Sequence, residues 1–85
     1  MLPNQETNQI SIFPNPTSEI LNINYLNNEF SELEISDLTG KIIERLNIEI
    51  GSKSKTINVS HYQQGIYILT FKSTNSLHKI KFIKI

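Results

Sequence analysis

Ser60 and His61 are adjacent and, together with Asp37, are of the types that perform nucleophilic and acid–base chemistry. A hydrolytic triad needs a nucleophile, a general base and an orienting carboxylate. The spacing of these residues does not support a triad, and no serine lies in a nucleophile-elbow motif. The lone carboxylate of Asp37 is weak evidence for a metal site, and the chain has no cysteine to form a zinc site, a thiolate nucleophile or a disulfide. We therefore expect no enzyme, no metal site and no cofactor.

The segment Asp37-Leu38-Thr39-Gly40-Lys41 instead predicts the turn of a β-hairpin. An aspartate at the first turn position can accept hydrogen bonds from backbone N–H groups two residues on. Gly40 can take a positive φ, which closes a type I turn in a longer hairpin connection. Asp37 is accordingly interpreted as a turn residue.

A second segment, residues 59–67 (VSHYQQGIY), has the pattern with which many sandwiches begin the strand after a cross-sheet corner. We expect a tyrosine corner, in which the hydroxyl of Tyr67 hydrogen-bonds to the upstream backbone. Tyr62 would fill the end of the core and Gly65 would supply the bend. His61 is expected to be an exposed turn residue.

The third feature is the tail, residues 78–85, in which Lys79, Lys81 and Lys84 alternate loosely with apolar residues. Lysines on the outer face of a last strand protect a sheet edge against pairing with neighbours. Alternatively, this strand is presented to a receptor that adds it to a sheet. The sequence alone leaves both interpretations open.

The tripeptide Pro14-Asn15-Pro16 predicts a rigid, extended kink between the first two strands. Proline cannot donate to a sheet ladder, and it biases the preceding residue towards extended backbone. We expect a segment that cannot be drawn into a sheet, with Thr17 and Ser18 closing the bend through side-chain hydrogen bonds.

The elements that must position these motifs are short strands. Apolar and polar residues alternate with a period of two, and turn signals separate the runs. Strands are predicted at residues 9–13, 19–25, 32–36, 41–50, 54–59, 65–72 and 77–84. In the fourth run, Ile42, Leu46, Ile48 and Ile50 share one parity. About seven short strands favour an all-β, immunoglobulin-like antiparallel β-sandwich, with a small barrel as the alternative.

Composition limits the functional classes. The chain has 85 residues, enough for one domain, and includes 15 Ile and 10 Asn with no Ala, which favours strands and turns. Its net charge of zero argues against nucleic acid as a partner. No apolar run is long enough to span a bilayer, and no signal peptide is visible. The chain is therefore either cytoplasmic or a fragment of a longer exported protein, in which residues 1–9 form a flexible linker.

The order of these motifs along the chain resembles the type A C-terminal sorting domain of the type IX (Por) secretion system. The motifs are the Pro14-Asn15-Pro16 kink, the Asp37–Lys41 hairpin, the Tyr62–Tyr67 corner and the lysine-bearing last strand. The resemblance covers about residues 10–85. One departure is Tyr62, where the family usually has leucine; a large ring can fill the same site. The positions that match the family pattern are Pro14, Asn15, Pro16, Asp37, Gly40, Lys41, Gly65, Tyr67, Lys79, Lys81 and Lys84.

This resemblance implies a secretion signal. Such domains guide a cargo, carried upstream in the same chain, from the periplasm through the outer-membrane translocon to the cell surface or the medium. The implied partners are the type IX translocon, its shuttle components and a sortase-like peptidase that removes the domain and anchors the cargo. Weak self-association through an edge strand is a further expectation.

A β-sandwich adhesion or carbohydrate-binding module is the alternative function; it would need a face of exposed aromatic rings. Under the first hypothesis, deleting residues 81–85 is expected to abolish export while leaving most of the fold intact.

Overall fold

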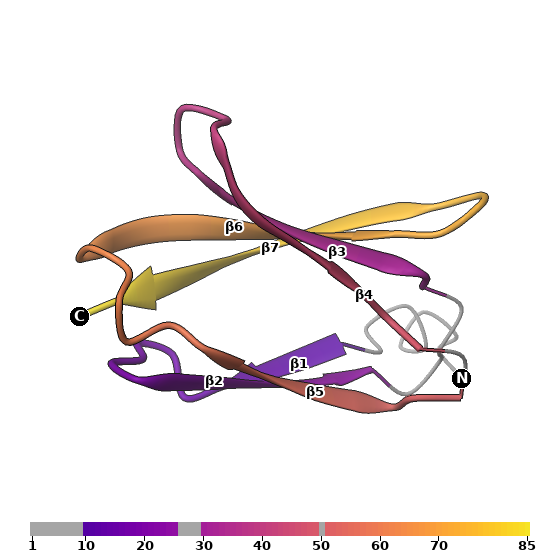
Figure 1. Cartoon of the computed structure of the whole chain (residues 1–85), viewed down its shortest axis with the longest axis horizontal. Coiled ribbons are helices and arrows are strands. Elements are labelled where there is room, and N and C mark those ends of the chain that lie inside the picture. Colours follow the sequence, from indigo (N-terminus) through magenta and orange to yellow (C-terminus); the bar gives the residue numbers. More distant parts are fainter. Residues whose placement is uncertain (1–9, 26–29, 50) are drawn as a thin grey trace, which may run out of the picture.

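The described part of the chain folds into seven β-strands arranged in two layers (Figure 1). The structure is a computed structural model, and it describes residues 10–25, 30–49 and 51–85. The expected linker, residues 1–9, lies outside the described residues. The strands are β1 (Ile10–Phe13), β2 (Ile20–Tyr25), β3 (Glu32–Asp37), β4 (Ile42–Asn47), β5 (Ser54–Asn58), β6 (Gly65–Lys72) and β7 (Leu77–Lys84).

The strands form two antiparallel sheets. One sheet has the order β1-β2-β5 and the other β4-β3-β6-β7. Two stacked sheets confirm the predicted sandwich and show that the alternative of a small barrel was wrong. In Figure 1 the β3–β4 hairpin extends beyond the body of the sandwich, and the end of β7 lies close to the β1–β2 connection.

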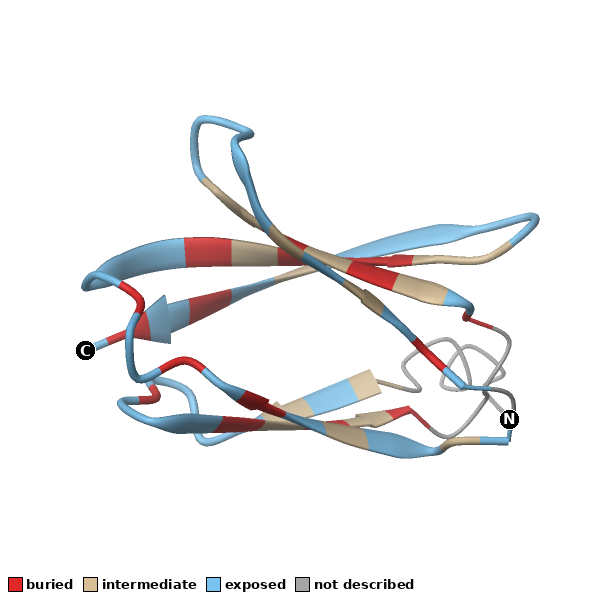
Figure 2. Ribbon diagram, in the orientation of Figure 1, coloured by how far each residue is buried: buried red, intermediate tan, exposed pale blue. Residues whose placement is uncertain are grey.

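The core lies between the sheets, and buried residues alternate with more exposed ones along parts of strands such as β2, β3 and β7 (Figure 2). In β2 the side chains of Leu21, Ile23 and Tyr25 are fully buried, and their neighbours are partly exposed. Six of the seven aromatic residues are buried, and Phe13 is 47% exposed. The period of two therefore predicted the inward face of the strands with little error.

Strand β4 departs from this pattern. The pairing of β3 with β4 shifts register between Ile35 and Ser36, so that Glu44 lies opposite Ile35 and Ile42 lies opposite Ser36. A bulge inserts one residue and reverses the side-chain alternation beyond it. Ile42 is consequently exposed, although it shares its sequence parity with Leu46, which packs against the core.

Candidate functional site

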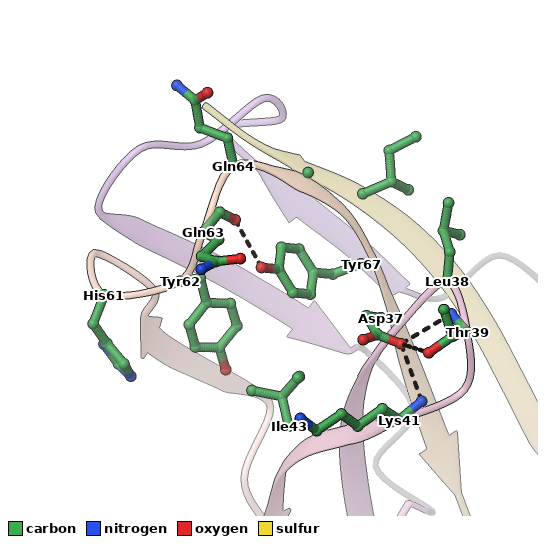
Figure 3. A pocket seen from close by; sticks show the side chains of 12 residues that line it. Asp37, Leu38, Thr39, Lys41, Ile43, His61, Tyr62, Gln63, Gln64 and Tyr67 are labelled. Atoms are coloured by element: carbon green, nitrogen blue, oxygen red, sulfur yellow. Dashed lines mark hydrogen bonds between the residues drawn. The ribbon is translucent and has the colours of Figure 1, made fainter.

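One carboxylate oxygen adds three hydrogen bonds to the backbone bonds that close the Asp37–Lys41 hairpin. Oδ1 of Asp37 accepts hydrogen bonds from the backbone N–H of Thr39 (2.9 Å), the hydroxyl of Thr39 (2.7 Å) and the backbone N–H of Lys41 (3.0 Å) (Figure 3). These bonds hold the pKa of the Asp37 carboxyl below its usual value, the hydroxyl of Thr39 having the largest effect. Gly40 has φ of +93°, as the turn requires. The predicted turn chemistry is confirmed.

The corner before β6 is also as predicted. The hydroxyl of Tyr67 donates a 2.7 Å hydrogen bond to the carbonyl oxygen of Gln63. Gly65 has φ of +155°, a conformation that L side chains rarely adopt. Tyr62 is buried, and its hydroxyl donates to Oε1 of Glu44 at 2.6 Å. Burial, reinforced by Glu44, raises the pKa of the Tyr62 hydroxyl well above its usual value.

The hairpin and the corner face each other across an open groove of about 570 Å³ (Figure 3). Asp37, Leu38 and Lys41 line one side, and Tyr62 and Ile66 line the other. The side chains of Leu38 and Ile66 are 60% and 40% exposed. Two segments that lie far apart in the sequence thus form one continuous surface with apolar and cationic side chains.

Asp37, Ser60 and His61, the residue types of a triad, do not assemble into one. The hydroxyl of Ser60 donates to Oδ1 of Asn58 at 2.7 Å, and the carboxylate of Asp37 is engaged by its own hairpin. His61 is exposed and packs edge-on against the ring of Tyr62. Each residue serves the turn that carries it.

The PNP segment, Pro14 to Pro16, is exposed and lies beside the end of β7. Oδ1 of Asn15 accepts a 2.9 Å hydrogen bond from the backbone N–H of Ile83. Thr17 then forms a parallel bridge with Lys84: its N–H donates to the carbonyl of Ile83, and its carbonyl accepts from the N–H of Ile85, both at 2.9 Å. Residues 14–16 themselves stay out of both sheets, as expected, and the bridge of Thr17 to the terminal strand is a contact that was not predicted.

Thr17 is the residue whose role sequence reasoning underestimated. Its side chain is 1% exposed, and its hydroxyl donates to the carbonyl of Ile20 at 2.6 Å, as the predicted bend closure requires. Nothing in the residues around Thr17 predicts its pairing with β7. We call the contacts of Asn15 and Thr17 with residues 83–85 the tail latch.

The three lysines of the tail lie on opposite faces of β7. Lys79 and Lys81 are exposed on the outer face, as predicted for an edge strand. Lys84 is on the inner parity and is only 7% exposed, so its expected place on the outer face was wrong. Its Nζ donates a 3.1 Å hydrogen bond to the carbonyl oxygen of Ile85, which gives the ammonium group one polar partner.

Among residues 10–25, 30–49 and 51–85, no cluster of histidine and acidic side chains is arranged to hold a metal ion. Over the same part of the chain, no helix is long and apolar enough to cross a membrane. The notable residues instead form surfaces on a hairpin, a corner and a terminal strand. These features define a small immunoglobulin-like β-sandwich whose distinctive residues shape surfaces and turns.

The family is shown by sequence. A family model described as "Secretion system C-terminal sorting domain" matches residues 11–85, and the chain belongs to this family. The domain is a C-terminal sorting signal of type IX secretion, which implies interaction with that machinery and export to the cell surface or secretion.

A solved structure supports the fold independently. The protein is similar to a DUF3244 family protein from Bacteroides vulgatus ATCC 8482, described as having an immunoglobulin-like β-sandwich fold. The TM-score is 0.77 at 18% sequence identity, over 94% of this chain and 88% of that one. No curated protein sequence matches the chain.

Proposed function

We propose that residues 10–85 direct an exported cargo from the periplasm through the outer-membrane type IX translocon. A sortase-like peptidase then removes the domain and anchors the cargo at the cell surface. The observation that carries this proposal is the family match over residues 11–85, together with the confirmed hairpin and corner. In this proposal the domain is a recognition module without catalytic activity, and shuttle components accompany it to the peptidase.

The surface that the translocon recognises is proposed to comprise β7 and the β3–β4 hairpin. Lys79, Lys81 and Lys41 are exposed cations on these two elements. Exposed charge on rigid elements favours recognition by a partner, since it steers encounter and sets specificity. Gly40, Gly65 and Tyr67 act through the fold, because they shape the turns beside this surface.

Processing can be tested with a reporter protein that carries a signal peptide and is followed by residues 1–85. We expect a type IX-competent strain to release the domain and to retain the reporter on its surface. A strain that lacks the sortase-like peptidase should instead leave the domain attached to the reporter. Release that is equal in both strains would contradict the proposed processing.

Weak self-association is proposed at the β4 edge. The segment Ile42–Asn47 is an outer strand of its sheet and carries no lysine; its two charged residues, Glu44 and Arg45, have opposite signs, so the strand has no net charge. Edge strands with little charge are the ones most prone to pair. Sedimentation should show a concentration-dependent dimer that a lysine at the exposed Ile42, Ile42→Lys, weakens; a monomer at all concentrations would contradict this proposal.

The alternative of a carbohydrate-binding module is not favoured. Such a module needs exposed aromatic rings on one face, but six of the seven rings lie in the core. Phe13 alone, at 47% exposure, does not form a stacking platform.

A further inference from the structure

The outer edge of β7 is divided into a closed part and an open part. In an antiparallel strand, the N–H and C=O of alternate residues point to opposite edges. The backbone groups of Ile83 and Ile85 point away from β6, because they bond to Asn15 and Thr17. The tail latch therefore closes the last part of this edge.

The alternation places the backbone groups of Lys79 and Lys81 on the same outer edge as those of Ile83. Within the part of the chain that the structure describes, no other strand pairs with β7 on that side. The N–H and C=O groups of Lys79 and Lys81 are thus available for one further strand. The latch sets the length of this open segment, which runs from Leu77 to Lys81.

The side chains along the open segment carry unbalanced positive charge. Lys79 and Lys81 are both exposed on the outer face, and their cross-strand neighbours on β6 are Thr70 and Ile68. The ion pairs found in the described part of the chain join Glu34 to Arg45 and Lys72, and they do not include either tail lysine. Between the two lysines, Ile80 faces inward and packs against the core while remaining partly exposed.

We propose that the open segment of β7 binds one extended peptide segment with the pattern acidic–apolar–acidic. This inference rests on the proposed function, in which the secretion machinery recognises the terminal strand. A strand added antiparallel to β7 places its residues directly opposite Lys79, Ile80 and Lys81. Carboxylates then pair with the two lysines on the outer face, and the apolar residue between them covers Ile80.

The two lysines indicate that the strand added to β7 belongs to a different chain and not to a second copy of this domain. Two copies paired antiparallel about Ile80 would set Lys79 of each against Lys81 of the other. Like charges directly opposite each other destabilise a strand pair. An acidic strand removes this repulsion.

The test uses the isotopically labelled 85-residue chain and the blocked peptide Glu-Val-Glu-Thr-Val, followed by NMR. We expect saturable shifts of the Lys79 and Lys81 amides at about 1 mM peptide. The double variant Lys79→Glu/Lys81→Glu should keep its fold, since both side chains are exposed. It should bind this peptide about tenfold more weakly and instead bind Lys-Val-Lys-Thr-Val, because the charge pairing is inverted.

The absence of shifts at these amides, or equal binding of both peptides to the wild-type domain, would overturn the proposal. Peptide-induced amide shifts confined to β4 would also overturn the proposal. Export of a reporter separates this inference from the proposed function. Normal export by the folded double variant would refute the docking site and leave the sorting function standing, whereas failed export by the wild-type domain would refute the sorting function itself.

Discussion

The backbone N–H of Ile83 donates a 2.9 Å hydrogen bond to the side-chain oxygen of Asn15, 68 residues earlier in the sequence. Thr17 adds two backbone hydrogen bonds to the same end of β7. The PNP segment and the tail, which mark the two ends of the matched family region, are therefore joined directly in space. This contact ties the point where the sorting domain begins to the strand that is proposed to be recognised.

Removing the acceptor of Asn15 should loosen the tail. Asn15→Ala leaves the N–H of Ile83 without its partner, and we expect it to lower the free energy of unfolding by about 1 kcal/mol. Hydrogen exchange at the Ile83 amide should quicken more than exchange in β2. Asn15→Asp keeps an acceptor at this position and is the matched control. Unchanged protection of Ile83 in the alanine variant would contradict the tail latch.

The tyrosine corner should contribute measurably to stability. Tyr67→Phe removes only the hydroxyl that bonds to the carbonyl of Gln63, and it should cost about 1 kcal/mol of unfolding free energy in urea. Tyr67→Ala should cost about 3–5 kcal/mol, because the buried ring also stacks on Phe82. If the phenylalanine variant were as stable as the wild type, the hydroxyl would have no structural role.

Stability should fall at acidic pH. Hydrogen bonds from Thr39 and Lys41 lower the pKa of Asp37, and bonds from Arg45 and Lys72 lower that of Glu34. Because both folded-state pKa values lie below the unfolded ones, the stabilisation is present above about pH 4–5 and is lost as pH falls through the folded values. Asp37→Asn should flatten the acid limb of the curve of unfolding free energy against pH. Parallel curves for variant and wild type would contradict this assignment.

The stability of the β3–β4 hairpin should depend on the backbone conformation of Gly40 and not on the space around this residue. A Cβ atom at this position meets nothing within 4 Å, but φ is +93°. Gly40→Ala should therefore destabilise the domain by about 1–2 kcal/mol, and Gly40→Asn by less, because asparagine tolerates positive φ better. Thermal unfolding followed by circular dichroism gives the order, and an alanine variant as stable as the asparagine variant would be the contrary result.

A chain that lacks residues 81–85 should lose its fold as well as its export, so this deletion cannot distinguish a role in recognition from a role in folding. The deletion removes Phe82, which is fully buried, and the whole tail latch. Loss of such a side chain alone costs about 3–5 kcal/mol, a large part of the 5–15 kcal/mol that small domains possess. We therefore expect the truncated chain to lose its circular-dichroism transition, against the expectation that most of the fold would remain.

The sequence predicted the features that depend on neighbouring residues. All seven strands lie where the period of two placed them, to within a few residues at their ends. Asp37 and Gly40 predicted the hairpin, and Tyr67 with Gly65 predicted the corner, because these turns are built from local hydrogen bonds and backbone preferences.

Features that depend on register or on distant contacts were missed. The bulge beside Ile35 turned Ile42 outward, and alternation alone cannot reveal a slip of one residue. The burial of Thr17 and Lys84 follows from a bridge between segments at opposite ends of the matched region. No periodicity within either segment encodes that pairing.

Surface display of a reporter tests the central claim most directly. The reporter, exported to the periplasm by a signal peptide, would carry residues 1–85 at its C-terminus in a type IX-competent strain and in a strain without the translocon. We predict that external protease reaches the reporter on intact cells of the competent strain only. A reporter that stays in the periplasm of the competent strain, with the domain intact and folded, would contradict the account.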